Sequence, residues 1–172
     1  LALDPADASG TTYLYDGERR RMTSKTVHVD ALLPDGLVGR RSKIFYFSHQ
    51  GAVISRPAAG LTWTAQAAYV LADPNRSNTR MLEQWLGIGT ANSVRTLKDS
   101  LDKVVGLPWV NTVAADRDGN TLYADASVVP HMNADKFVNG CLLLQAALLF
   151  DGSKSSCGWG QDVGAPAGIY AP

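Results

Sequence analysis

Apolar residues recur at helical spacing between positions 94 and 105 of the chain. Those at i, i+3, i+7, i+10 and i+11 fall on one face of an α-helix: Val94, Leu97, Leu101, Val104 and Val105. Ser93 directly precedes this face and is predicted to cap the helix. Gly106 and Pro108 follow this face. A glycine in the left-handed conformation commonly ends a helix, and a proline shortly after it prevents the helix from continuing.

After Pro108 the pattern predicts a β-hairpin. Strand-forming runs at 109–115 and 121–127 flank Asp118-Gly119, a dipeptide typical of a type I′ turn, in which both central residues have positive φ. Pairing across such a turn predicts one shared face made of Trp109, Asn111, Val113, Ala115, Leu122, Ala124, Ala126 and Val128. The other face carries Val110, Thr112 and Ala114, so neither face is plainly solvated, and we expect the hairpin to lie inside a layered sheet.

Short strands and turns are predicted for the first 72 residues. We expect strands at 11–15, 26–31, 40–48 and 61–71, with turns at 16–17 and 33–36. The run 26–31 alternates like a half-buried strand, with His28 in its polar set. The basic clusters at 19–21 and 40–41 could indicate a polyanion site, but charged edge strands that resist pairing explain them as well.

A second helix is predicted after Asp73, with Pro74 at its first position. It carries an apolar stripe that is more typical of a core face than of a ligand wall: Met81, Leu82, Trp85 and Leu86. Gly87 and Gly89 are expected to fray its end. Further on, the pattern indicates a helical turn at 133–139, a buried segment at 142–150 that fits either a strand or a helix, and a loop at 153–168.

Charge and hydropathy exclude some classes of partner. Sixteen basic and sixteen acidic side chains leave no net charge, whereas nucleic-acid-binding and anionic-membrane-binding domains normally carry a basic excess. The longest apolar run, Cys141 to Phe150, is interrupted by Gln145. It is also far shorter than the roughly 18 to 20 residues of a membrane span. We therefore expect no nucleic acid and no membrane span.

No pattern in the chain indicates a metal or a cofactor. There is no CxxC motif, and the three histidines are far apart in sequence: His28, His49 and His131. Asp116, Asp118 and Asn120 begin like a calcium loop but lack the completion of an EF-hand. Ser48 and His49 adjoin, but neighbours on a strand point to opposite faces, so they are not expected to form a catalytic couple.

Two longer segments, LPWVNTVAADRDGNTLYADASVVP (107–130) and NRSNTRMLEQW (75–85), carry a family resemblance. They resemble the β-subunit of the penicillin-acylase-type N-terminal-nucleophile hydrolases. The branch they are most similar to contains acyl-homoserine-lactone acylases and the aculeacin/echinocandin-type cyclic lipopeptide acylases. Further similar phrases, from YLYDGERRRM to LLFDGSKSSCGWGQD, extend the resemblance over nearly the whole chain.

The resemblance implies an α+β fold, in which this chain supplies antiparallel strands and a two-helix excursion to an αββα sandwich. Residues 1–172 would be a single segment of an acylase β-subunit rather than an independent domain. The whole enzyme would remove a long acyl chain from an amine such as a homoserine lactone or a cyclic lipopeptide. In that family, apolar and aromatic side chains of this part of the β-subunit line the acyl pocket, which nominates Trp109, Val110 and Trp85 as substrate-binding residues.

The resemblance assigns no catalytic residue to this chain. Such hydrolases use the side chain of their first residue, Ser, Thr or Cys, with its own α-amino group as the base. Leu1 has no nucleophilic atom, and no internal Asn matches the family's oxyanion phrase. The ends of the chain suggest a processed or excised segment. Residues 1–3 look like the end of a strand whose beginning is elsewhere, which would leave sheet edges open, so we expect the chain alone to be inactive and poorly soluble. Its partners would be the α-subunit and the nucleophile-bearing and remaining parts of the β-subunit.

Two questions stay open at this level. Cys141 and Cys157 would be buried thiols in a cytosolic protein and a disulfide in an exported one. The resemblance implies a secreted or periplasmic protein and so favours the disulfide. The alternative function is a non-catalytic β-rich module that binds an apolar ligand or a protein partner through its tryptophans: Trp63, Trp85, Trp109 and Trp159.

Overall fold

The computed structural model describes residues 1–160, which belong to two compact units. The first unit comprises Leu1–Ala72 and Lys136–Gly158, and the second comprises Asp73–Asp135 and continues from Trp159. The loop predicted at 153–168 begins within the described residues, and its part from 161 onward lies outside them. Every pair of named strands in residues 1–160 is antiparallel, which confirms the predicted α+β class.

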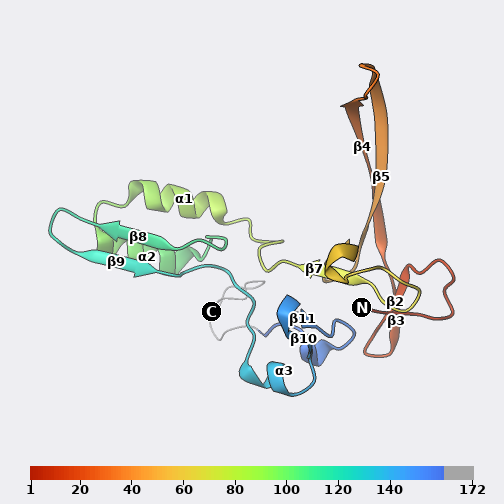
Figure 1. Cartoon of the computed structure of the whole chain (residues 1–172). Coiled ribbons are helices and arrows are strands. Elements are labelled where there is room, and N and C mark those ends of the chain that lie inside the picture. Colours follow the sequence, from red (N-terminus) through yellow and green to blue (C-terminus); the bar gives the residue numbers. More distant parts are fainter. Residues whose placement is uncertain (161–172) are drawn as a thin grey trace. The chain divides into compact units, whose positions relative to one another are not determined.

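Antiparallel strands build the first unit (Figure 1). They pair in the orders β1-β2-β3, β4-β5-β6-β7 and β10-β11. The strand bounds are β1 Ala2–Leu3, β2 Thr12–Tyr15, β3 Glu18–Arg21, β4 Thr23–Leu32, β5 Val38–Phe47, β6 Gly51–Ile54, β7 Tyr69–Ala72, β10 Leu142–Leu144 and β11 Leu149–Phe150. The predicted turn between β2 and β3 is confirmed, because Asp16 and Gly17 both have positive φ, 52° and 82°.

Short helices precede or follow some of these strands. They are the 3₁₀ helices η1 Pro57–Ala59, η2 Gln145–Ala147 and η3 Ser155–Cys157, and the α-helix α3 Ala134–Val138. The helical turn predicted at 133–139 is thus confirmed. The segment 142–150 proves to be the hairpin β10–β11 around η2, and most of its residues are exposed, so the prediction of a buried segment was wrong. The predicted strand 61–71 is also wrong for most of its length, since only Tyr69–Ala72 is a strand.

The core of the first unit forms beside β1 and β2. It consists of four buried side chains, Leu3, Tyr13, Met22 and Ala68. Trp63 packs against this core and meets the edge of Tyr46, with ring centroids 5.2 Å apart. Among residues 1–160, β3, with its three exposed arginines at 19–21, is an edge strand, as the interpretation of that basic cluster as a charged edge predicted.

The hairpin β4–β5 is long and exposed (Figure 1). Its ten-residue strands pair from Thr23–Phe47 to Leu32–Val38. β5 pairs with β6 only at Phe47, so the rest of the ribbon has no third strand among the described residues. The strand predicted at 26–31 is confirmed as part of β4, but the prediction that it is half-buried was wrong: most of that run is exposed, and Leu32 beyond it is 76% exposed.

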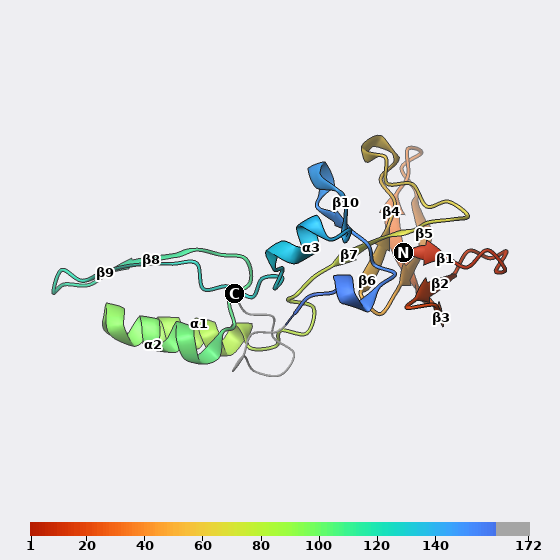
Figure 2. The same cartoon turned by 90° about the horizontal axis from the view of Figure 1, so that it is seen from below.

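The second unit contains a helix pair and a hairpin (Figure 2). Its elements are α1 Met81–Thr90, α2 Val94–Val104, β8 Thr112–Ala115 and β9 Thr121–Ala124. The helices lie side by side, and one face of the hairpin covers α2 through Val110, Ala114, Leu122, Ala124 and Ala126, which pack on Leu97, Leu101 and Leu107. α2 is the helix predicted from its apolar periodicity, and Ser93 caps it as predicted, in a capping box with Thr96.

The predicted start and end of α1 were wrong. Asp73 does not cap it, since its carboxylate accepts the N–H of Asn75 at 2.8 Å within a separate turn, and the helix begins only at Met81. Gly87 and Gly89 do not fray the helix, which continues through both to Thr90. Helix packing overrides the weak helix propensity of these glycines.

The face predicted for the β8–β9 hairpin was also wrong. Ala115 pairs with Thr121 and Thr112 with Ala124, which leaves a loop of Asp116 to Asn120. Gly119 has a φ of 85° and Asp118 has no positive φ, so the loop is a type I turn followed by a left-handed glycine and not a type I′ turn. The longer loop shifts the register by one residue, which moves Val113 and Tyr123 to the exposed face.

The left-handed residue after α2 is Val105, with a φ of 46°, and not the predicted Gly106. Gly106 serves close packing instead. A Cβ atom built at this position would lie 2.6 Å from the carbonyl oxygen of Arg80 and 2.9 Å from the Cβ of Gln84.

Candidate functional site

Trp85, nominated for substrate binding, lies on the outward face of α1. It is 52% exposed, and the other three residues of its apolar stripe are exposed as well: Met81, Leu82 and Leu86. α1 packs on α2 through a different side, where Gln84 is fully buried. The expectation that this stripe forms a core face is therefore wrong within the described residues, and the stripe is available to contact something else.

Trp109 lies between α2 and β8. Its side chain is 71% exposed, and its backbone has a φ of 26°. A strand was predicted from residue 109, but β8 begins only at Thr112. The indole is therefore presented by a loop and not by the sheet. A positive φ is unusual for a bulky side chain, and surrounding contacts must hold such a residue in place.

Val110 follows Trp109 directly but lies in a different environment. Its side chain packs against the cluster formed by Leu97, Leu101 and Leu107. Its backbone N–H donates to the Oγ of Ser127 at 3.0 Å, and the same hydroxyl donates to its carbonyl oxygen at 2.8 Å. Val110 thus anchors the loop to the unit, whereas Trp109 and Trp85 offer exposed apolar surface.

Polar side chains hold the chain just before Trp109. Arg80 donates from Nε to the carbonyl oxygen of Val104 at 3.0 Å and from a terminal nitrogen to that of Val105 at 3.3 Å. Gln84 accepts the N–H of Gly106 at 3.1 Å, and Asn78 donates to the carbonyl oxygen of Gly106 at 3.0 Å. Sequence reasoning missed these residues. The available signal was two polar residues four apart, Arg80 and Gln84, on the side of α1 opposite its apolar stripe.

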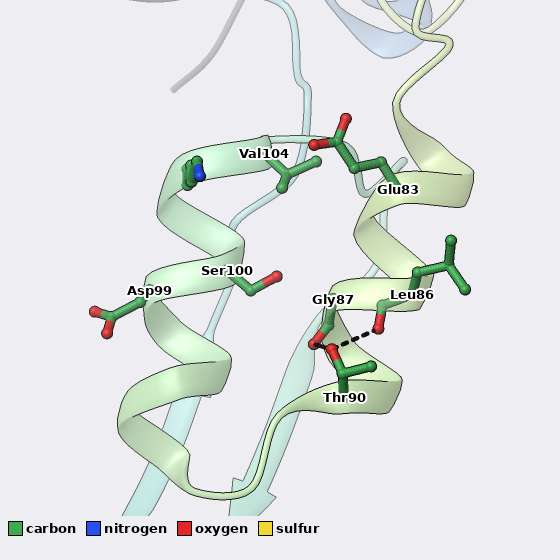
Figure 3. A pocket seen from close by; sticks show the side chains of 8 residues that line it. Glu83, Leu86, Gly87, Thr90, Asp99, Ser100 and Val104 are labelled. Atoms are coloured by element: carbon green, nitrogen blue, oxygen red, sulfur yellow. Dashed lines mark hydrogen bonds between the residues drawn. The ribbon is translucent and has the colours of Figure 1, made fainter.

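An open groove of about 410 Å³ runs between α1 and α2 (Figure 3). Its lining residues are Glu83, Leu86, Gly87, Thr90, Asp99, Ser100, Lys103 and Val104. None of the nominated substrate-binding residues is among them. Its polar groups do not converge on one point: the Thr90 hydroxyl, for example, donates back to the carbonyl oxygens of Leu86 and Gly87 at 3.0 and 3.2 Å.

Ser48 and His49 engage different partners. They lie in the turn between β5 and β6 rather than on a strand. The Oγ of Ser48 accepts the N–H of Gln50 at 3.1 Å, whereas the Nδ1 of His49 is 2.8 Å from the hydroxyl of Tyr13. Burial, and then the charge of Arg20, lower the pKa of His49. This arrangement does not aim an imidazole at a serine hydroxyl.

A serine–histidine contact that the sequence did not predict occurs on the long hairpin. The Nδ1 of His28 lies 2.6 Å from the Oγ of Ser42, its partner in the strand register. Beside this pair, Asp30 and Arg40 bond to each other at 3.3 Å. All four groups are exposed on a two-stranded ribbon, which offers no enclosed space in which a hydrolytic reaction could be shielded from water.

The carboxylate of Asp116 is used inside the protein. It accepts the backbone N–H groups of Asp118 and Asn120 at 3.1 and 3.0 Å and that of Val94 at 3.2 Å. Within residues 1–160, no group of three or more His, Cys, Asp or Glu residues could hold a metal ion. In the same part of the chain, no helix has the length and apolar character needed to cross a membrane.

Cys141 and Cys157 form a disulfide, with Cα atoms 5.3 Å apart. The chain between them is bound to the rest of the first unit. Asp16 accepts the N–H of Ser155 at 2.9 Å, and Gln50 donates to the carbonyl oxygen of Gly152 at 3.1 Å. Disulfide bonds of this kind form and persist in oxidising compartments.

Comparison with known proteins gives one consistent result. A family model described as penicillin amidase matches residues 1–172. An acyl-homoserine lactone acylase PvdQ of Pseudomonas fluorescens (strain Pf0-1) is 41% identical over 175 residues, which cover 99% of this chain and 22% of the relative. Aculeacin-A acylase of Actinoplanes utahensis is 36% identical over 181 residues, which cover 100% of this chain and 22% of the relative.

The structure of this chain is similar to that of a thermostable penicillin G acylase from Alcaligenes faecalis. The TM-score is 0.59 and the identity 18%, over 78% of this chain and 22% of that chain. At this identity the likeness shows the fold alone, and it agrees with the predicted α+β architecture. This chain spans about a fifth of the length of each of these proteins.

Proposed function

We propose, from the premise that this chain belongs to the penicillin amidase family, that it is one segment of the β-subunit of an acylase. The match of the family model to residues 1–172 carries this proposal. The relatives named above are acylases, which supports a hydrolytic enzyme. Since the chain spans about a fifth of their length, we propose that it is not an independent domain and that the nucleophile belongs to another part of the enzyme.

The reaction that we propose for the whole enzyme is hydrolysis of the amide between a long acyl chain and a polar amine. The amine would be a homoserine lactone, which the name of the Pseudomonas relative mentions, or the peptide part of a cyclic lipopeptide. This chain would contribute sheet strands and part of the acyl-pocket wall, formed by Trp109, Trp85 and Val110. The exposed indoles of Trp85 and Trp109 support this role, because large exposed apolar groups usually mark a contact surface.

The proposed partners are other chains of the same acylase, namely the α-subunit and the remaining parts of the β-subunit. The exposed apolar side chains of the β4–β5 hairpin, such as Leu32 and Val38, support a covering polypeptide. We also propose a secreted or periplasmic location, supported by the disulfide between Cys141 and Cys157.

Replacing Trp109 with Ala in the full-length acylase tests the proposed pocket wall. If long acyl chains contact this indole and short ones do not reach it, the variant should lose about 10- to 100-fold in kcat/KM on long chains. This corresponds to roughly 1–3 kcal/mol at up to about 0.8 kcal/mol per methylene contact. The measurement is kcat/KM for acyl homoserine lactones of about four to twelve carbons, beside a melting curve.

Tyr123→Ala is the matched control. Tyr123 is a comparably exposed aromatic residue of the same unit, on the outer face of the β8–β9 hairpin. Its removal should leave the chain-length profile unchanged. If Trp109→Ala instead loses the same factor at every chain length and melts at a lower temperature, Trp109 is a structural residue and not part of the pocket.

The second candidate is a non-catalytic β-rich module that binds an apolar ligand or a protein partner. The exposed tryptophans favour it as much as they favour a pocket wall. The two functions differ in turnover. An acylase segment gains amide hydrolysis when its partner chains are present, and the 172-residue chain alone should be inactive. A binding module would hold its ligand alone and would gain no turnover.

A further inference from the structure

We infer that Arg80 is a positioning residue for Trp109 and thereby sets the acyl-chain preference of the enzyme. This inference rests on the proposed function, in which Trp109 forms part of the acyl-pocket wall. The backbone between α2 and β8 has positive φ at two residues, 46° at Val105 and 26° at Trp109.

Both residues are poorly suited to that conformation. Val105 is β-branched and Trp109 is bulky, and positive φ brings the Cβ atom of either one close to the backbone. Such conformations persist only where the surrounding structure over-determines them, and they gather at functional sites. Pro108 lies between the two residues and fixes its own φ, so the direction of the indole follows from the backbone conformation set at 105–107.

Side chains of residues 78–84 supply the contacts that hold this backbone. Arg80 donates to the carbonyl oxygens of Val104 and Val105 at 3.0 and 3.3 Å. These carbonyls end α2, where the helix dipole is negative and a cation is favourable. Hydrogen bonds from a guanidinium are charge-assisted, and its planar fork suits adjacent acceptors. Arg80 therefore acts as the C-terminal cap of α2.

Gln84 and Asn78 hold the next residue, Gly106, through hydrogen bonds to its backbone. Gln84 is fully buried, with its amide nitrogen 3.2 Å from the carbonyl oxygen of Ser100 and its amide oxygen 3.1 Å from the nitrogen of Gly106. Asn78 donates to the carbonyl oxygen of Gly106 at 3.0 Å. Only glycine fits there, because an added Cβ would lie 2.6 Å from the carbonyl oxygen of Arg80.

The chain is held again directly beyond Trp109. Ser127, 1% exposed, bonds both backbone groups of Val110, and the carbonyl oxygen of Leu107 accepts the N–H of Val128 at 3.0 Å. Trp109 is thus an exposed side chain on a backbone that is fixed on both sides by buried or half-buried polar groups. Such pre-organisation suits a group that must meet a ligand at a defined place.

The test compares Arg80→Met with Ser93→Ala in the full-length acylase. Both variants remove a cap of α2, but Ser93 caps the end that is distant in sequence from Trp109. Arg80→Met should lose about 10-fold more kcat/KM on a twelve-carbon acyl homoserine lactone than on a four-carbon one, mainly through KM, because a displaced wall weakens contact with long chains. Ser93→Ala should lose the same factor on both, and Arg80→Lys should recover part of the preference.

A second readout does not depend on activity. With 5-fluorotryptophan incorporated, the ¹⁹F resonance of Trp109, assigned by Trp109→Phe, should be unchanged in Ser93→Ala. In Arg80→Met it should shift or split. If Arg80→Met does not fold, Ser127→Ala carries the same two measurements, since it releases the chain on the other side of Trp109.

An unchanged resonance, or an acyl-chain profile like that of Ser93→Ala, overturns the inference. A chain-length-dependent loss in Trp109→Ala with a flat Arg80→Met profile overturns it too, but leaves the proposed function standing. If the wild-type enzyme hydrolyses no acylated amine, the proposed function itself fails, and with it the specificity role of Arg80.

Discussion

The carboxylate of Asp116 accepts the backbone N–H of Val94 at 3.2 Å and so joins the loop of the β8–β9 hairpin to the first residue of α2. The side-chain amide of Asn120 bonds the same carboxylate at 3.0 and 3.1 Å. These bonds favour the ionised form, with Asn120 contributing most and Val94 next, and they lower the pKa of Asp116.

The lowered pKa of Asp116 predicts acid sensitivity at the junction of hairpin and helix. A carboxyl group whose pKa is lower in the folded state stabilises that state above its unfolded pKa of about 4. The stabilisation is lost as the pH falls through the lower folded value. We expect Asp116→Asn to reduce hydrogen-exchange protection at the start of α2 at pH 7 and to remove this pH dependence, both measured as opening free energies.

Asp118→Asn is the control for this prediction, because it changes a carboxylate in the same loop. Its own backbone N–H donates to Asp116, a bond that the substitution keeps. Protection of the first turn of α2 should stay at the wild-type level. An equal loss in both variants would assign the effect to the net charge of the loop and would contradict the role of Asp116.

The disulfide between Cys141 and Cys157 should be formed in the mature protein. Thiol titration of the unfolded, unreduced chain is then expected to find neither cysteine free. Replacing both cysteines with Ser should destabilise the first unit by about 3 kcal/mol, the magnitude for a loop of this size. Protease cleavage between residues 141 and 157 would report this loss. Two reactive thiols would contradict both the bond and the proposed extracytoplasmic location.

The sequence predicted those elements whose signal is local. α2 has a strict apolar period and a serine cap, and both were found as predicted. The hairpin turn at Asp16-Gly17 was also correct, because its two residues tolerate positive φ without help from the rest of the fold. The family resemblance, which depends on long segments and not on one residue, was confirmed by the match to the penicillin amidase model.

The errors came from contacts between distant residues. The turn residues Asp118-Gly119 fit either a two-residue turn or the longer loop of Asp116 to Asn120, and the register that decides between them depends on which face packs on Leu97 and Leu101 of α2. Val105 adopts a positive φ although glycine follows it, because Gly106 is needed for the close approach of Arg80. The local preferences of Val105 and Gly106 do not predict which of the two adopts the positive φ.

The apolar side of α1 was predicted to be a core face, but it is exposed. Its apolar stripe has correct helical spacing, so the periodicity alone indicates burial. The side that packs on α2 instead carries a polar residue, Gln84, and a glycine, Gly87. A buried glutamine with every partner satisfied cannot be told from a solvated one without the structure.

Gly87 and Gly89 lie two residues apart in α1, and alanine should have opposite effects at the two positions. A Cβ atom at Gly89 would meet no atom within 4 Å, whereas one at Gly87 would lie 2.2 Å from the Oγ of Ser100. Gly89→Ala should stabilise α1 by about 0.5–1 kcal/mol through helix propensity. Gly87→Ala should destabilise the helix pair by about 1–3 kcal/mol, as overpacking does.

Hydrogen exchange of the α1 amides in the full-length enzyme measures both effects, and a double variant identifies the cause at Gly87. The Ser100 hydroxyl cannot turn away freely, because the side-chain amide of Gln84 is bonded to it at 3.2 Å. Ser100→Ala removes the colliding oxygen and leaves its Cβ 3.4 Å from the added atom, an ordinary contact. Gly87→Ala should therefore destabilise the helix pair much less in the Ser100→Ala background. A double-mutant cycle measures this coupling between the two positions. An equal destabilisation in both backgrounds would contradict the close packing of Gly87 in α1 against Ser100 in α2.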